Sequence, residues 1–240
     1  MDVAQVVAEG IRPFWVMFWQ WLLPAVLGLS GLKLLVEPAL KGAAGEKRVG
    51  RLLGKMAAEV RNDVLLPDGN GGLTQIDHLA LGPSGIWVVE TKNYGGSIFG
   101  KAAEKRWTQK LGGQSFRFQN PLRQNHAHIK ALELVLPDAP IFGRVVFTDR
   151  ARFPKGVPEG VTLARDMARE LQTDIGTGDI SPALQAKWEA LAHRIRIGKE
   201  ARKAHRQGLQ RKHGKSFRKP LAVGLLGAGG VVFVAAHVLL

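Results

Sequence analysis

The sequence predicts an α/β domain tethered by two transmembrane helices. Three observations support this prediction. Short β-rich runs alternate with segments whose apolar residues recur at helical spacing. One pair of β-rich runs is separated by a cluster of turn residues, which is typical of a hairpin. Two long segments, one near each end of the chain, are apolar and free of Asp, Glu, Lys and Arg.

The composition indicates a polyanionic partner and a reducing compartment. The chain has 240 residues, no cysteine and a formal net charge of +14. The lack of cysteine excludes disulfides and thiolate-ligated zinc. The excess of positive charge is typical of proteins that contact nucleic acid or an anionic membrane. A solubilising basic surface is the alternative explanation for this charge.

Residues 13–36 are predicted to form a transmembrane helix after a short N-terminal tail, residues 1–12. The first part of this segment, residues 13–32, carries no charge, and about 20 apolar residues span a bilayer core. Three tryptophans near its start are typical of an interfacial aromatic belt. A cleaved signal peptide is the alternative, but its first region should be positive, and the tail carries two acids against one arginine.

The last segment, residues 221–240, is predicted to form a second transmembrane helix. It is rich in glycine, which permits close helix packing. A buried C-terminal helix is the alternative. Basic residues flank the middle region of the chain on both sides, so the positive-inside rule places that region on the cytoplasmic side of the inner membrane.

The region between these segments begins with a helix, a strand and a hairpin. Apolar residues at helical spacing predict a helix over 42–58, with Glu46 on its apolar stripe. A β-rich run predicts a strand over 59–66, and a loop follows it. The hairpin covers residues 74–92, with the turn at Gly82-Pro83-Ser84-Gly85.

Further strands and helices follow the hairpin. Residues 97–99 and 106–110 predict a short hairpin with a half-buried Trp107. Asn120-Pro121 marks the start of a helix that runs to about residue 136, and Gln124 lies on one stripe of this helix with His128. The remaining expected elements are strands at 141–148 and 161–163, a helix that ends near 172, and a long helix from Ser181.

The hairpin places an acid of its first strand opposite an acid of its second. If the four turn residues form the loop, Leu81 lies opposite Ile86 and Asp77 lies opposite Glu90, with Lys92 two residues further on. Directly opposite residues have Cβ atoms about 4.5–5.5 Å apart, and like charges there destabilise a sheet. We therefore hypothesise a divalent cation between the two carboxylates. A register slip of one residue would move Asp77 to the other face.

Glu46 and Gln124 lie on helices that can pack beside Asp77, Glu90 and Lys92. Hard oxygen ligands without cysteine suit Mg²⁺ or Mn²⁺. Such an ion acidifies water and polarises a phosphoryl oxygen, and a lysine beside it stabilises negative charge on the phosphate. A surface ion pair of Lys92 with either acid is the alternative, because an Asp followed by Glu-x-Lys is frequent by chance.

A strongly basic segment, residues 199–219, precedes the second apolar segment and contains one acid, Glu200. Basic segments beside a membrane bind anionic lipid, and basic helices also contact nucleic acid, so either partner fits. The candidate contact residues are Lys199, Arg202, Lys203, Arg206, Arg211 and Lys212.

Ordered motifs between residues 43 and 136 support a family resemblance. They are Gly45-Glu46-Lys47, Asn62-Asp63-Val64-Leu65-Leu66-Pro67, Thr74-Gln75-Ile76-Asp77-His78, Gly85-Ile86-Trp87-Val88-Val89-Glu90-Thr91-Lys92-Asn93, Gly96-Ser97-Ile98, Trp107 and Asn120-Pro121-Leu122-Arg123-Gln124-Asn125. This set resembles the nuclease-related domain (NERD) family, a branch of the PD-(D/E)XK nuclease superfamily. The superfamily's usual Pro-Asp pair is Ile76-Asp77 here, which retains the carboxylate.

The resemblance implies a restriction-endonuclease-like fold, in which a mixed sheet is flanked by helices. It implies that Asp77 and Glu90 hold the divalent metal, together with the backbone carbonyl of Thr91. It also implies roles for three other residues: Lys92 as the catalytic lysine, Glu46 as the acid that orders the metal or its water, and Gln124 as a neighbour of the metal or the lysine.

We therefore expect a nuclease-related domain over residues 42–155 and an accessory helical and polybasic region over 156–220. The expected function is that of a membrane-anchored nuclease that uses Mg²⁺ or Mn²⁺ to hydrolyse nucleic acid, DNA rather than RNA, on the cytoplasmic side. The alternative is a non-catalytic nuclease-like module that tethers nucleic acid or anionic lipid at the membrane. A structural membrane protein whose basic segment engages lipid is a third hypothesis.

Overall fold

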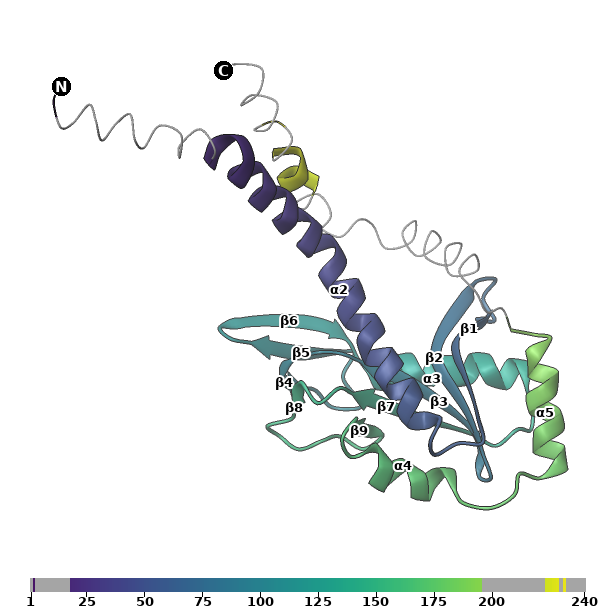
Figure 1. Cartoon of the computed structure of the whole chain (residues 1–240). Helices are drawn as coiled ribbons and strands as arrows, with labels where there is room; N and C mark the ends of the chain where they lie inside the picture. The colour runs from purple at the N-terminus through teal and green to yellow at the C-terminus, as the bar shows by residue number, and fades with distance from the viewer. Residues whose placement is uncertain (1, 3–17, 196–222, 229–230, 232–240) are drawn as a thin grey trace. The chain divides into compact units, whose positions relative to one another are not determined.

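In the computed structural model, a five-stranded mixed sheet forms the core of the unit that spans residues 42–209 (Figure 1). Its strand order is β1-β2-β3-β7-β9. The first three strands are antiparallel neighbours, whereas β3, β7 and β9 run parallel to one another. The strands are β1 (Glu59–Pro67), β2 (Leu73–Gly82), β3 (Gly85–Lys92), β7 (Ile141–Phe147) and β9 (Val161–Leu163).

The structure describes residues 2, 18–195, 223–228 and 231. The chain divides into two compact units, residues 42–209 and residues 1–41 together with 210–240. The basic segment 199–219 lies outside the described residues, and so do its candidate contact residues, Lys199, Arg202, Lys203, Arg206, Arg211 and Lys212.

Helices cover both faces of the large sheet. Leu132 of α3 (Pro121–Val135) and Trp188 of α5 (Pro182–Ala192) are buried against one face, which we call the α3 face. Leu53 at the end of α2 (Leu23–Leu53) and Leu171 of α4 (Met167–Ile175) are buried against the other, the α4 face. This arrangement confirms the predicted α/β class. Elements of the expected accessory region, β9, α4 and α5, contribute side chains to the cores.

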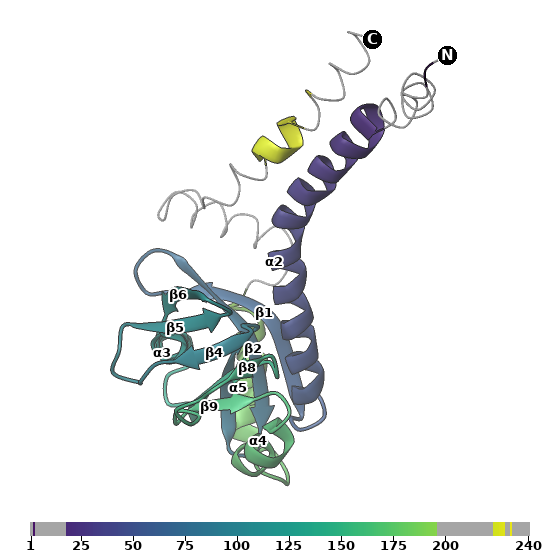
Figure 2. The same ribbon diagram turned by 90° about the vertical axis from the view of Figure 1, so that its left-hand side faces the viewer.

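A second, four-stranded sheet has the order β6-β5-β4-β8 (Figure 2). Trp107 and Ile98 of this sheet pack with Phe147 of β7 in a shared core. The rings of Trp107 and Phe147 are stacked, with centroids 6.2 Å apart. The strands are β4 (Gly96–Phe99), β5 (Arg106–Leu111), β6 (Gln114–Gln119) and β8 (Ala151–Arg152).

The β2–β3 hairpin has the predicted register. Leu81 pairs with Ile86, as the sequence pattern requires. The turn is shorter than expected, because Gly82 and Gly85 also pair with each other. Gly85 adopts φ +150°, and a side chain there would meet the carbonyl oxygen of Pro140 at 2.3 Å, so this position requires glycine.

Several local expectations are wrong. The helix expected over 42–58 is the end of α2, which stops at Leu53 because Gly54 begins a turn. The expected half-buried Trp107 is fully buried, since both sheets cover it. The long helix expected from Ser181 ends at Ala192. Strands β6 and β8 have no counterpart among the expected elements.

The described part of the chain contains no helix with both the length and the apolarity to cross a membrane. The expected spans, residues 13–36 and 221–240, lie partly outside the described residues. A π-helical turn, η1 (Phe18–Leu22), precedes α2. Large apolar side chains on these two elements are exposed, among them Trp21, Leu29 and Leu32.

Candidate active site

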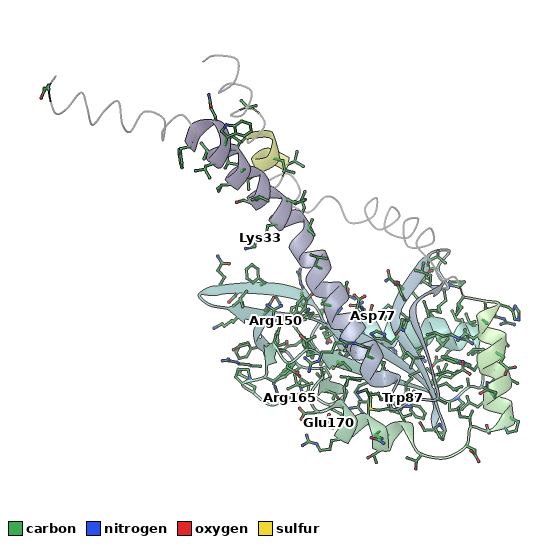
Figure 3. All side chains as sticks on the ribbon, in the orientation of Figure 1. Lys33, Asp77, Trp87, Arg150, Arg165 and Glu170 are labelled. Carbon is green, nitrogen blue, oxygen red and sulfur yellow. The ribbon has the colours of Figure 1, made fainter. Side chains whose placement is uncertain are left out.

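The candidate site lies where β2 and β3 separate. Backbone pairing between these strands ends at His78 and Val89. Beyond that pair, Asp77 Oδ2 accepts a hydrogen bond of 2.8 Å from the Thr91 N–H. The Asp77 carboxylate thus replaces a backbone partner of β3 and lies beside Glu90, the residue before Thr91. Figure 3 labels Asp77 on the ribbon.

The Lys92 ammonium is held between a carboxylate and an amide. Its Nζ donates hydrogen bonds to Glu90 Oε1 at 2.6 Å and to Gln124 Oε1 at 2.9 Å. Only 15% of the Lys92 side chain is exposed, and only 3% of that of Glu90. Burial lowers the pKa of Lys92, but the charge and hydrogen bond of Glu90 outweigh it, and the pKa lies above its usual value. Lys92 therefore stays protonated at neutral pH.

Gln124 is positioned by the capped start of α3. The N-cap residue, Asn120, accepts the Leu122 N–H at 2.9 Å through its side-chain oxygen. Its amide nitrogen donates to the carbonyls of Ala102 and Glu104, at 2.9 and 2.7 Å. Asn120 is fully buried. These bonds fix the first turn of α3 to the loop before β5, and the Gln124 side chain with it.

Burial and neighbouring carboxylates raise the pKa of Asp77 well above its usual value. Burial has the largest effect, followed by the negative charge of Glu90. The Thr91 N–H lowers the pKa, and the negative charge of Glu46 raises it further. Glu46 therefore lies close enough to Asp77 to affect its ionisation, although it comes from α2 rather than from the sheet. The structure thus brings all five expected residues to one region, with Lys92 between the acids and Gln124.

His128, which the sequence left without a role, is also a site residue. Its Nε2 lies 3.3 Å from Glu90 Oε2 and 3.4 Å from Gln124 Nε2. Its Nδ1 lies 2.8 Å from the hydroxyl oxygen of Thr74. The i, i+4 spacing from Gln124 already places His128 on the same helix stripe. Its contact with Glu90 depends on how α3 packs on the sheet, which the spacing does not show.

The carboxylates of the site suit a hard divalent cation. Burial raises the pKa of Glu90, but His128 and Lys92 outweigh it, and the pKa lies below its usual value. Glu90 Oε2 is buried and lies 3.3 Å from His128 Nε2, without a well-formed hydrogen bond within the described residues. Among the described residues no three His, Asp or Glu side chains group closely enough to hold an ion. Asp77 and Glu90 would therefore need main-chain, water or phosphate oxygens to complete a ligand set.

His78 lies on the opposite face of the sheet from Glu90 and Lys92. Its Nδ1 is 2.6 Å from Asn62 Oδ1, and its Nε2 is 3.0 Å from Thr91 Oγ1. Burial lowers the pKa of His78 to about 4, despite the opposing effect of the Glu90 charge. A neutral imidazole at this position links β1, β2 and β3 beneath the candidate site and has a structural role.

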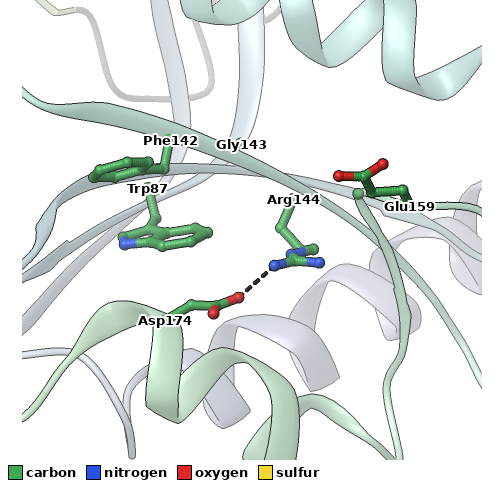
Figure 4. A pocket seen from close by; sticks show the side chains of 7 residues that line it. Trp87, Phe142, Gly143, Arg144, Glu159 and Asp174 are labelled. Atoms are coloured by element: carbon green, nitrogen blue, oxygen red, sulfur yellow. Dashed lines mark hydrogen bonds and ion pairs between the residues drawn. The ribbon is translucent and has the colours of Figure 1, made fainter. Parts of the chain in front are cut away.

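A pocket of about 430 Å³ lies on the α4 face and is separate from the candidate site (Figure 4). Trp87 and Phe142 stack at its edge with ring centroids 5.1 Å apart. Arg144 forms an ion pair with Asp174 in its wall. None of the five expected site residues lines this pocket. The candidate chemistry therefore lies at the separated ends of β2 and β3, outside this cavity.

Comparison with known proteins identifies related sequences for the central part of the chain. A protein of Bacillus anthracis described as uncharacterized is 41% identical over 118 residues. The alignment covers 48% of this chain and 56% of the relative, so the chain spans little more than half of the relative's length. No solved structure matches the chain. Residues 41–148 match the nuclease-related domain family, NERD, and include every residue of the candidate site.

Proposed function

We propose that the chain is a metal-dependent nuclease that hydrolyses phosphodiester bonds of nucleic acid, with DNA as its substrate. The observation that supports this best is the buried Lys92 ammonium between Glu90 and Gln124, beside Asp77. This cluster lies within the region that matches a nuclease-related family. Two carboxylates next to a protonated lysine provide both metal ligands and a cation for a phosphate.

Asp77 and Glu90 would hold Mg²⁺ or Mn²⁺, together with the carbonyl oxygen of Thr91. When bound, the ion supplies neutralisation of phosphate charge and acidification of the attacking water. The buried Oε2 of Glu90 supports this assignment, because its 3.3 Å contact with His128 is not a well-formed hydrogen bond and the described residues offer it no other, so a ligand there would be stabilising. A cation would also relieve the repulsion between Asp77 and Glu90.

The other residues of the site would act on the phosphate and on water. The Lys92 ammonium would stabilise the negative charge that develops on the phosphate in the transition state. Gln124 accepts one N–H of that ammonium and so fixes its direction. Glu46 would accept a hydrogen bond from the attacking water and orient it, which its proximity to Asp77 supports.

Membrane association on the cytoplasmic side of the inner membrane is a further part of this proposal. It rests on the uncharged apolar stretches and on the exposed Trp21, Leu29 and Leu32 of η1 and α2. The basic segment 199–219 would contact anionic lipid or nucleic acid. We expect the chain to remain in the membrane fraction after a wash with alkaline carbonate. Its recovery in the soluble fraction would contradict this part of the proposal.

The nuclease assignment is tested by incubating the purified 240-residue chain with single- and double-stranded DNA and RNA. Reactions contain Mg²⁺, Mn²⁺ or a chelator. We expect cleavage only with metal, and its loss in Asp77→Ala and in Lys92→Ala. Lys130→Ala is the matched control, because Lys130 is exposed and forms an ion pair with Glu133 on the surface of α3. Equal cleavage by the wild type and both site variants would reject the assignment.

A further inference from the structure

The small sheet has one covered face and one cationic face. Ile98, Trp107 and Ala151 point to its covered face, in the core shared with β7. Strand alternation and the cross-strand pairs place a different set of residues on the opposite side, which we call the outer face. These residues are Ser97, Phe99, Arg106, Thr108, Lys110, Ser115, Arg117, Gln119 and Arg152.

The four cations of the outer face are exposed and not neutralised. Strands β4, β5, β6 and β8 contain no acidic residue. Within residues 18–195, no carboxylate forms an ion pair with any of these four cations, whereas exposed cations elsewhere do pair, as in Arg48–Asp149 and Lys130–Glu133. The outer face therefore has a local excess of positive charge. The four are Arg106, Lys110, Arg117 and Arg152.

The cations are spread out rather than convergent. Arg106 and Lys110 are four residues apart on β5, which corresponds to about 13 Å along a strand. Arg152 and Arg117 lie on the two outermost strands of the sheet, and neighbouring strands are about 4.8 Å apart. This spacing does not form a pocket for one small anion. It suits a partner whose negative charges repeat along its length.

The fold connects this sheet to the candidate site at both ends. The segment 93–119 follows Lys92 directly and leads into Asn120, the cap of the helix that bears Gln124. Gln109 Nε2 of β5 donates a hydrogen bond of 2.7 Å to the Gly95 carbonyl, close to the start of the segment. A polymer held on the outer face would therefore lie near the candidate site.

We propose that the outer face binds the phosphate backbone of duplex nucleic acid and holds it beside the candidate site; this inference rests on the proposed function. Contacts from Arg and Lys to phosphates position a duplex without reading its sequence. Single-strand binding surfaces use rows of aromatic side chains. The outer face has one aromatic residue, Phe99, and Lys110 Nζ lies 5.9 Å from the centre of its ring.

The test compares two triple variants of the 240-residue chain with equal net charge. The first is Lys110→Gln, Arg117→Gln, Arg152→Gln. Arg106 is kept, because its guanidinium donates a hydrogen bond to the Arg117 carbonyl. The control is Lys55→Gln, Lys130→Gln, Arg169→Gln, which removes three exposed cations outside the small sheet. The measurement is the Kd for a labelled DNA duplex in chelator, where metal-dependent cleavage cannot occur, over a series of salt concentrations.

We expect the outer-face variant to bind about tenfold or more weakly than the control variant at low salt. The slope of log Kd against log salt should fall by about 0.9 for each lost contact, so by about 2.7 for three. Equal slopes for the two variants would overturn the proposal. So would loss of binding to phosphatidylglycerol vesicles with unchanged duplex binding, which would assign the face to lipid. Asp77→Ala should retain the wild-type slope, so a loss of cleavage can be distinguished from a loss of duplex binding by the outer face.

Discussion

The surroundings of Asp77 disfavour ionisation of its carboxyl group. Burial and the charges of Glu90 and Glu46 raise its pKa, so the folded chain favours the protonated carboxyl. Below the ordinary pKa of 3.8 this preference does not weaken the fold. As the pH rises through the raised folded value, the unfolded state loses its proton more readily and stability falls. At neutral pH the metal-free protein is therefore destabilised by Asp77.

The first prediction is that Asp77→Asn stabilises the metal-free chain. Asparagine keeps an oxygen for the Thr91 N–H but removes the charge. In chelator at pH 7 the melting temperature should rise, by about 2–4 °C for each kcal/mol of stability gained. The gain should shrink as the pH falls from the raised pKa of Asp77 towards 3.8, and it should be absent below that value. A lower melting temperature for the variant at pH 7 would show that the Asp77 charge does not destabilise the fold.

The second prediction concerns His128, which contacts Glu90 and Gln124. Truncation to alanine leaves Glu90 Oε2 without this neighbour and permits the carboxylate to rotate. We expect His128→Ala to reduce metal-dependent cleavage on the order of 10- to 100-fold and to weaken the apparent metal affinity. His126→Ala is the matched control, since His126 is exposed on the same helix. Equal rates for the two variants would remove His128 from the site.

Strand periodicity alone is enough to relate Asp77, Glu90 and Lys92. These three residues lie on one hairpin, and its register follows from the alternation of apolar side chains and the turn. His128 and Asn120 are different, because each also has distant partners that depend on tertiary packing. Glu90 lies 38 residues from His128, and the carbonyls of Ala102 and Glu104 lie 18 and 16 residues from Asn120. A buried histidine also has no pattern that separates a site role from a core role.

At the scale of elements, α2 packs closely on the strand end that bears the site. A Cβ built at Gly45 would lie 2.9 Å from the Cβ of Asn93, the residue after Lys92. At Gly42, one turn earlier, the nearest atom would be Glu46 Oε1 at 4.0 Å. Of these two glycines, only Gly45 is therefore required to be small.

The third prediction compares alanine at these two positions. Gly42→Ala should stabilise the chain slightly, because alanine favours helix by about 1 kcal/mol over glycine. Gly45→Ala should instead lower the unfolding free energy, by about 1–3 kcal/mol from overpacking against Asn93. Chemical denaturation measures both. If Gly45→Ala unfolds at the same denaturant concentration as Gly42→Ala, the close packing of α2 on β3 is not present in solution.

The elements themselves differ in how far their sequences specify them. Strands β1, β2, β3 and β7 have apolar patterns and appear where predicted. Strand β6 reads Gln-Ser-Phe-Arg-Phe-Gln and is mostly exposed, so its pattern alone does not separate strand from loop. It forms because it pairs with β5 over six positions. The burial of Trp107 also depends on tertiary packing, because other residues of its core, such as Phe147, are distant in sequence.

At the scale of the whole molecule, the candidate site combines segments that are far apart in the chain. Glu46 comes from a helix, Asp77 and Glu90 from a hairpin, and Gln124 from a helix reached after the small sheet. The parallel pairing of β3 with β7 joins residues about 55 positions apart and places the end of β3 in the interior of the sheet. Sequence patterns predicted the α/β class, but this long-range pairing required the structure.

The central claim is that Asp77 and Glu90 jointly bind a divalent cation beside Lys92. Titration of the 240-residue chain with Mn²⁺, followed by electron paramagnetic resonance of the free ion, tests this most directly. We predict saturable binding by the wild type and its loss in both Asp77→Asn and Glu90→Gln, with their folds intact by circular dichroism. Saturable binding that persists unchanged in both variants, or none in the wild type, would contradict the account.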